Sequence, residues 1–110
     1  MKNDKKYLGH VLESINAIED YLVGRNQESF EDDRMAKAAV VRELEIIGEA
    51  LNRLNKEFTQ KHPEVVLRDA IAMRNFLIHE YFDVDAKVVW ETCQNDLPDL
   101  KKSVQKQLAD

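Results

Sequence analysis

The stretch VVRELEIIGEAL, residues 40–51, carries the clearest structural signal in the chain. Its apolar residues recur three and four positions apart, which is the spacing of one face of an α-helix. The same pattern extends on both sides and predicts one helix that begins with Ser29 as its cap and ends near Phe58. The apolar positions form two adjoining stripes, and a surface that wide contacts more than one neighbour. The stretch therefore predicts the central helix of a helical bundle.

Three further segments show the helical spacing of apolar residues. The first runs from about residue 4 to residue 23, and Gly24 then favours a stop. Another begins at His62–Pro63, because proline suits the first turn of a helix, and it runs to about Tyr81.

The last predicted helix begins near Ala86, and Asp85 before it is a good N-cap. Pro98 lies inside this helix and predicts a kink or a break about one turn earlier. No segment shows the alternation of a β-strand. We therefore expect an all-α fold, in which residues 1–110 form one domain: an up-and-down bundle of four to five helices joined by short connections.

The composition suits such a domain, since 44% of the 110 residues are apolar and there are only 3 Gly and 2 Pro. That mixture argues against disorder and against a turn-rich all-β fold. The single cysteine, Cys93, excludes a disulfide framework and a cysteine zinc site. The first residues lack the apolar run of a signal peptide, and no apolar stretch approaches the roughly 18 residues of a membrane span. A soluble, cytoplasmic protein that does not bind membranes is the expectation.

The charge balance restricts the functions that the chain could have. Its 16 Lys and Arg residues face 21 Asp and Glu residues, so the formal net charge is -5. Nucleic acid repels such a chain at long range, and any RNA or DNA site must therefore be local. His10 and His62 have no companions at metal-ligand spacing, and no glycine-rich phosphate loop is present. We expect neither a metal nor a cofactor.

The segment RNFLIHEY, residues 74–81, combines a permanent cation, a proton carrier and a phenol within about two helical turns. Arg74 and Tyr81 are seven positions apart and lie on the same side of a helix. Asn75 and His79 are four positions apart and also share a side. Arg74 and His79 differ by about 140° around the axis, so they would converge best at a helix end or across a dimer interface.

These residue types are those that RNA cleavage without a metal requires. A proton carrier must activate the 2′-hydroxyl or protonate the leaving oxygen, and histidine does this near neutral pH. A fixed cation must neutralise the charge that builds on the phosphoryl oxygens, and arginine does so by bidentate contact. Asn75 could orient the phosphate or the imidazole.

A purely structural interpretation of the same residues stays open. Arg74 could pair with Glu45 or Glu49 on the central helix, as an arginine on an inner helix face commonly does. The helix dipole favours a histidine such as His79 near a helix C-terminus. Tyr81 could lie half-buried with its hydroxyl in water.

The pattern Arg74-x4-His79-x-Tyr81 resembles the signature of the HEPN domain proteins and, among them, of the HepT toxins. The similarity extends from roughly Leu8 to Leu108, nearly the whole chain. The segments that match, in the same order as in those toxins, are Glu45–Ala50, His62–Pro63–Glu64, Met73–Arg74–Asn75, Tyr81–Phe82, Val84–Asp85 and Val89–Trp90.

This resemblance implies a HEPN-like all-α bundle that forms a homodimer, in which two Arg-x4-His motifs face one cleft. It implies a metal-independent ribonuclease toxin of a toxin–antitoxin pair, with Arg74 and His79 as the catalytic pair and Asn75 as a supporting polar residue. It also implies a partner, an MntA-like nucleotidyltransferase antitoxin that transfers adenylate from ATP to Tyr81. A bulky anion on Tyr81 would repel RNA and neutralise the toxin.

Two other interpretations of the chain as a whole remain. In one, the chain is a non-catalytic subunit of a nucleotidyltransferase, where Arg74 and His79 bind nucleotide or hold the dimer together. In the other, it is a dimerising bundle with a structural role alone. If two copies do form one cleft, they bring two Arg74 side chains, with Arg68 as a further candidate, to one place. The net charge then limits RNA binding to a small site and makes dimerisation a requirement of the mechanism.

Overall fold

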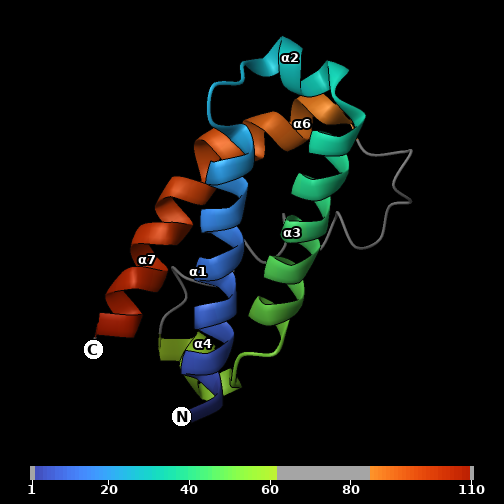
Figure 1. Cartoon of the computed structure of the whole chain (residues 1–110). Helices are drawn as coiled ribbons and strands as arrows, with labels where there is room; N and C mark the ends of the chain where they lie inside the picture. The colour runs from blue at the N-terminus through green and yellow to red at the C-terminus, as the bar shows by residue number, and fades with distance from the viewer. Residues whose placement is uncertain (1, 62–84, 110) are drawn as a thin grey trace.

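The computed structural model describes residues 2–61 and 85–109. Every regular element within them is helical (Figure 1), which confirms the all-α fold class for this part of the chain. No helix among the described residues is long and apolar enough to cross a membrane. In chain order the elements are α1 (Lys2–Leu22), α2 (Gln27–Asp32), α3 (Arg34–Asn52), α4 (Lys56–Lys61), α6 (Ala86–Glu91), the π-helical segment η2 (Thr92–Asp96) and α7 (Leu97–Ala109).

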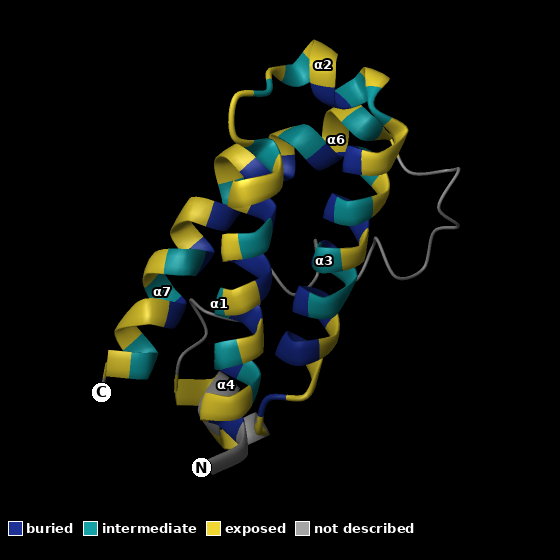
Figure 2. Ribbon diagram, in the orientation of Figure 1, coloured by how far each residue is buried: buried dark blue, intermediate teal, exposed yellow. Residues whose placement is uncertain are grey.

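Helices α1 and α3 run antiparallel at the centre of the bundle, and α7 packs beside α1 (Figure 1). The apolar faces of α1 and α3 are turned toward each other, so buried residues line the facing sides of the two helices (Figure 2). Burial of a large apolar side chain stabilises a fold by roughly 1.5–3 kcal/mol, and this contact is therefore the main source of stability. The core side chains that are at most 1% exposed include Leu8, Val11, Ile15 and Ile18 of α1, Val40, Leu44, Ile47 and Leu51 of α3, and Leu100 and Val104 of α7.

An aromatic pair fastens one end of the bundle. Phe30 of α2 is completely buried, and its ring lies 5.7 Å from that of Trp90 in α6, with 38° between the ring planes. Tilted aromatic pairs of this kind contribute about 0.5–1.5 kcal/mol beyond the area that they bury. The two short helices α2 and α6 are thereby held together across the ends of α1 and α3 (Figure 1).

The single helix predicted from Ser29 to Phe58 is wrong, because this range contains most of α2, all of α3 and the start of α4. Asp33 separates α2 from α3, since its backbone is extended, with φ −103° and ψ 101°. Its side chain accepts a hydrogen bond from the Ala36 N–H at 3.0 Å, so Asp33 is the N-cap of α3. One extended residue leaves the apolar spacing almost unchanged on either side, and the sequence pattern does not reveal it.

Ser29 is also not the N-cap that the sequence predicted. It is the third residue of α2, and Asn26 is the cap. The Ser29 N–H donates to Asn26 Oδ1 at 2.8 Å, and the Asn26 N–H donates to Ser29 Oγ at 3.0 Å, which makes a reciprocal capping box. Asparagine and serine are about equally good caps, so the sequence alone did not decide between them.

At its other end α3 stops at Asn52, and Phe58 belongs to the separate helix α4. Asn55 begins α4, because its Oδ1 accepts a hydrogen bond from the Glu57 N–H at 2.8 Å. Asparagine bonds readily to nearby backbone groups in turns, which lowers its preference for helix interiors. The cap at Asn55 starts a new helix, which explains why α3 does not continue into the apolar residues that follow.

A buried carboxylate ties this turn to the first turn of α1. Asp4 is 3% exposed, and its Oδ1 accepts a hydrogen bond from the Asn55 N–H at 2.8 Å, across 51 positions of sequence. The bond fixes the start of α4 against the start of α1. The chain therefore leaves the central helix pair in a defined direction just before residues 62–84.

Several predictions about helix ends are confirmed. The first helix, predicted over residues 4–23, is α1, and Gly24 follows it with φ +76°, a left-handed conformation that favours glycine. Asp85 caps α6, because its Oδ1 accepts a hydrogen bond from the Lys87 N–H at 2.9 Å. The helix predicted over residues 62–81 lies outside the described residues.

The break predicted ahead of Pro98 is also confirmed. Proline has no N–H to donate to the carbonyl one turn back, and its ring crowds that carbonyl. The helix responds by widening into η2, at Thr92–Asp96, directly before the turn that contains Pro98. The direction of the chain changes here, from α6 across the end of the bundle to α7 along its side (Figure 1).

We expect the stability contributed by Asp33 to depend on pH. The hydrogen bond from the Ala36 N–H, and then the Arg25 guanidinium at 2.8 Å, hold the pKa of the Asp33 carboxyl below its ordinary value of 3.8. A carboxyl with a lowered folded-state pKa stabilises the fold above its ordinary pKa and loses this contribution as the pH falls through the lowered value. Urea unfolding should therefore show Asp33→Asn to be less stable than the wild type at neutral pH, with the gap closing below pH 3.8. Asp32→Asn is the control for the lost charge, and a gap for Asp33→Asn that stays constant down to the lowest pH would contradict this account.

The Asp4 bond gives a second prediction. Asp4→Ala removes the acceptor of the Asn55 N–H, and the loss of one hydrogen bond costs about 0.5–1.5 kcal/mol. Amide hydrogen exchange at Asn55 should speed up in this variant, and the free energy of unfolding should fall. Asp4→Asn keeps an acceptor oxygen of the same shape and should have a smaller effect on both. Equal exchange rates at Asn55 in all three proteins would show that Asp4 does not hold the turn.

Candidate functional site

The residues that the sequence assigned to a catalytic site lie outside the described part of the chain. Arg74, Asn75, His79 and Tyr81 all fall within residues 62–84, and their roles stay predictions. The structure describes the helices before and after this segment, α4 and α6, and a polar groove between α1 and α3.

Helices α4 and α6 fix the positions of the two residues that flank residues 62–84. They follow Lys61 of α4, which lies at the end of the bundle where α1 begins (Figure 1). They lead to Asp85 and α6, at the opposite end of the bundle. A helix over the predicted range of 62–81 would rise roughly 30 Å, which is about the rise of the 21 residues of α1. The predicted helix is thus long enough to connect the two ends.

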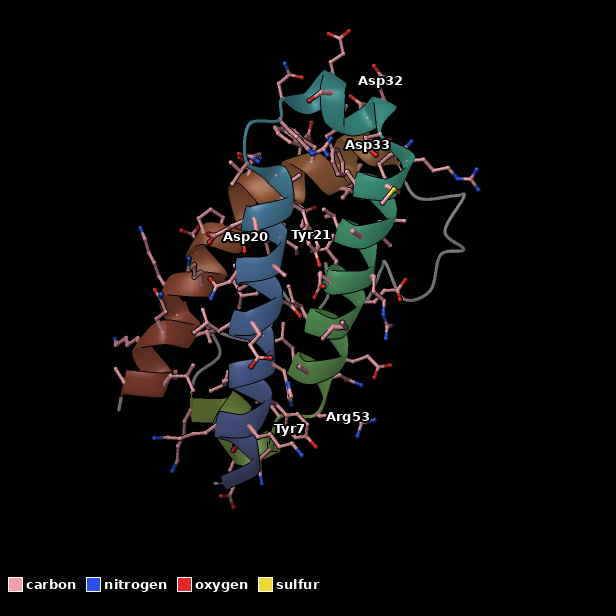
Figure 3. All side chains as sticks on the ribbon, in the orientation of Figure 1. Tyr7, Asp20, Tyr21, Asp32, Asp33 and Arg53 are labelled. Carbon is pink, nitrogen blue, oxygen red and sulfur yellow. The ribbon has the colours of Figure 1, made fainter. Side chains whose placement is uncertain are left out.

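A groove between α1 and α3 forms a cavity of about 260 Å³. Helix α1 contributes Tyr7 and His10 to its lining. The other lining residues lie on α3 and at its C-terminal end: Arg42, Glu45, Ile46, Glu49, Ala50 and Arg53. Figure 3 shows Tyr7 and Arg53 at the same end of the bundle.

The arginine and glutamate side chains of the groove all come from α3 and its C-cap, while α1 contributes an aromatic ring and an imidazole. Arg42 Nη1 lies 3.7 Å from Glu45 Oε2, a pair that is 71% and 32% exposed. Ala50, which is buried, and Ile46, which is half-buried, add apolar surface to the lining. At the far end, Arg53 is exposed and forms no ion pair within residues 2–61 and 85–109.

The sequence pattern predicted no site in this groove. On α3 the signal was present as an Arg42, Glu45, Glu49 and Arg53 series at intervals of three and four, which places all four on one face. The contribution of α1 was not predictable, because it depends on which helix packs against this face. Glu45 and Glu49 were considered only as partners for Arg74, and Glu45 has a cation partner on its own helix.

The described residues contain no group of three or more His, Cys, Asp and Glu side chains that could hold a metal ion. His10 Nδ1 lies 4.0 Å from the Glu13 carboxylate, a contact between exposed side chains. Cys93 is buried, and burial raises the pKa of its thiol to about 12. A thiol with so high a pKa stays protonated at neutral pH and is a poor nucleophile.

Comparison with known families gives a match that covers most of the chain. The family model described as "Ribonuclease HepT-like" matches residues 11–107. The matched range includes all four residues of the predicted site.

Individual relatives agree with this match. "Putative RNase TTE0752" of Caldanaerobacter subterraneus subsp. tengcongensis is 41% identical over 104 residues, which cover 94% of this chain and 93% of the relative. "Probable ribonuclease HepT" of Thermococcus cleftensis is 40% identical over 105 residues, 96% of each chain. "Gamma-glutamylcyclotransferase and putative RNase MJ0434" of Methanocaldococcus jannaschii is 39% identical over 105 residues, 96% of this chain and 47% of that protein. No solved structure gives a significant match.

Proposed function

The chain belongs to the ribonuclease HepT-like family, and from this premise we propose that it is a metal-independent ribonuclease whose catalytic pair is Arg74 and His79. The observation that carries the proposal is the Arg74-x4-His79 motif inside the matched residues 11–107. The motif supplies a proton carrier and a fixed cation, the two groups that RNA cleavage needs when no metal takes part.

In the proposed reaction His79 accepts the proton of an RNA 2′-hydroxyl. The 2′-oxygen forms a bond to the adjacent phosphorus while the bond from phosphorus to the 5′-oxygen of the next nucleotide breaks, and that oxygen takes up a proton from water. Arg74 binds the phosphoryl oxygens, where negative charge builds in the transition state. Asn75 supports the site by orienting the phosphate or the imidazole. The products are one end with a 2′,3′-cyclic phosphate and one with a 5′-hydroxyl.

We propose that residues 1–110 act as one domain within a homodimer. A net charge of -5 opposes RNA binding over the surface as a whole. Two copies related by a two-fold axis bring two Arg74 side chains to one cleft, with Arg68 as a further candidate, and concentrate positive charge there. The proposed site is therefore small and local, and its affinity for RNA in general is low.

The proposed control of the activity is a modification of Tyr81. In this scheme the chain is the toxin of a toxin–antitoxin pair in the cytoplasm, and an MntA-like nucleotidyltransferase is the antitoxin. Transfer of adenylate from ATP to the Tyr81 hydroxyl releases pyrophosphate and leaves an anion on the tyrosine. Two positions from His79, that anion repels the phosphates of RNA and blocks the site.

Arg74→Ala and His79→Ala test the catalytic proposal. In the presence of a chelator the wild type should cleave RNA. His79→Ala should be slower by about 10²–10⁴-fold, the usual contribution of a general acid or base. Arg74→Ala should be slower by about 10²–10³-fold, the usual effect of losing one group that stabilises charge in the transition state. His62→Ala is the control, a histidine outside the motif, and should keep the wild-type rate. Thermal melting of all four proteins checks that lost activity is not lost folding. Equal rates in the wild type and both motif variants would show that the chain is a binding subunit without catalytic activity.

Tyr81→Phe tests the proposed modification. When the chain is co-expressed with the nucleotidyltransferase and supplied with ATP, intact-mass spectra should show added adenylate on the wild type and none on Tyr81→Phe. Tyr21→Phe is the matched control, because Tyr21 is an exposed tyrosine whose hydroxyl donates to Glu43 Oε2 at 3.2 Å. This control should gain adenylate as the wild type does. Adenylate that persists on Tyr81→Phe would rule out the proposed role of Tyr81.

A further inference from the structure

The groove between α1 and α3 has a lining that fits one class of ligand. Its charges are balanced, because α3 and its C-cap contribute two cations and two carboxylates to the lining: Arg42, Arg53, Glu45 and Glu49. A simple anion would be repelled by the two carboxylates, and a simple cation by the two guanidinium groups. The groove therefore suits a ligand that carries both an anionic group and hydrogen-bond donors.

The two ends of the groove differ in which charges are available. Arg42 lies 3.7 Å from Glu45, so these two side chains partly neutralise each other. Arg53 and Glu49 are both exposed and form no ion pair within the described residues. Within residues 2–61 and 85–109, one cation and one carboxylate are thus available to a ligand. Glu49 lies in the last turn of α3, and Arg53, the C-cap of that helix, follows four positions later.

The rest of this end suits a flat ring. Tyr7 of α1 is half-buried, and its ring lies in the lining close to Arg53 (Figure 3). Ile46 and Ala50 add apolar side chains to the lining. The cavity of about 260 Å³ is slightly below the range of roughly 300–1,000 Å³ for small-molecule sites. It can hold one nucleotide rather than several.

We propose that this groove binds a guanosine nucleotide of single-stranded RNA, as a recognition site of the proposed ribonuclease, and the inference rests on that function. The base packs against Tyr7, Ile46 and Ala50 of the lining, as bases do on aromatic side chains in single-stranded RNA recognition. Glu49 accepts hydrogen bonds from the adjacent N1–H and N2–H donors of guanine, which match the two oxygens of a carboxylate. Arg53 binds the phosphate.

The hydrogen-bond donors of guanine explain why Glu49 favours this base over the other three. Its Watson–Crick edge presents two neighbouring N–H groups, whereas adenine, cytosine and uracil each present a donor beside an acceptor. An acceptor opposite Glu49 would be repelled by the carboxylate. A basic peptide would also be attracted to Glu49, but Arg53 and Arg42 would repel it at both ends of the groove.

The test measures binding separately from cleavage. The full chain is titrated with the 5′-monophosphates of guanosine, adenosine, cytidine and uridine, and amide NMR shifts locate the site. Guanosine monophosphate should bind most tightly and shift the amides around Tyr7, His10 and Glu49. A 2′-O-methyl oligonucleotide, which cannot be cleaved through its 2′-oxygen, should bind better when it contains guanosine.

Two variants of exposed residues separate the roles of cation and carboxylate. Arg53→Gln should weaken guanosine monophosphate by about tenfold, and Glu49→Gln should reduce its preference over adenosine monophosphate by about tenfold, the effect of one bidentate contact. Two control variants make the same charge changes on exposed residues outside the groove lining: Lys102→Gln in α7 and Glu28→Gln in α2. Both should bind guanosine monophosphate as the wild type does.

The outcomes distinguish this inference from the proposed function. The inference is overturned if the four nucleotides bind equally, if the shifts lie elsewhere, or if Arg53→Gln and Glu49→Gln bind as the wild type does, even when RNA cleavage requires Arg74 and His79. If the chain binds guanosine monophosphate in the groove but RNA cleavage does not depend on Arg74 and His79, the groove stands as a nucleotide site and the proposed catalytic function fails.

Discussion

Apolar side chains of α1 and α3 interlock along both helices, and the other described elements take their positions from this contact. Val11 and Ile15 of α1, with Leu44 and Ile47 of α3, are completely buried in it. Helix α7 covers a further side of α1, while α2 and α6 close one end (Figure 1). Because the inner faces are fully used in packing, the polar residues of α1 and α3 are left on an outer face. The groove is a consequence of this, since its two walls are the outer edges of the same helix pair.

Local sequence signals predicted much of the fold, and their failures have physical causes. Gly24, Asp85 and Pro98 each act through their own backbone or side chain, and the structure has the predicted stop, cap and break at these positions. The long helix predicted through Asp33 failed because one extended residue hardly alters the spacing of apolar residues. Two interactions of Asp33 accompany the break between α2 and α3. One is the hydrogen bond that its side chain accepts from the Ala36 N–H, and the other is its ion pair with Arg25, which lies on the other side of α2.

The candidate sites differ in how far the sequence reveals them. Arg74 and His79 are close in sequence, so their chemistry can be recognised without a structure, and the family match covers both. Tyr7 and Arg53 are far apart in sequence and meet only because α1 and α3 pack antiparallel. The same limit applies to Asp4, which looks like an ordinary acidic residue in a first helical turn but is buried against the backbone of Asn55. The spacing of apolar residues predicts helices, but it does not predict which residues far apart in the sequence come together.

The excess of acidic residues and the proposed action on RNA are compatible if contact with RNA is confined to a few arginines. The measurement that tests this central claim most directly is the chemistry of the RNA ends produced by the purified chain in a chelator. The account predicts fragments with 2′,3′-cyclic phosphate and 5′-hydroxyl ends. It also predicts no cleavage of a bond when the nucleotide on its 5′ side is a 2′-deoxynucleotide, because the attacking 2′-hydroxyl is then missing. Cleavage that continues at the 2′-deoxynucleotide, or that occurs only when a divalent cation is added, would contradict it.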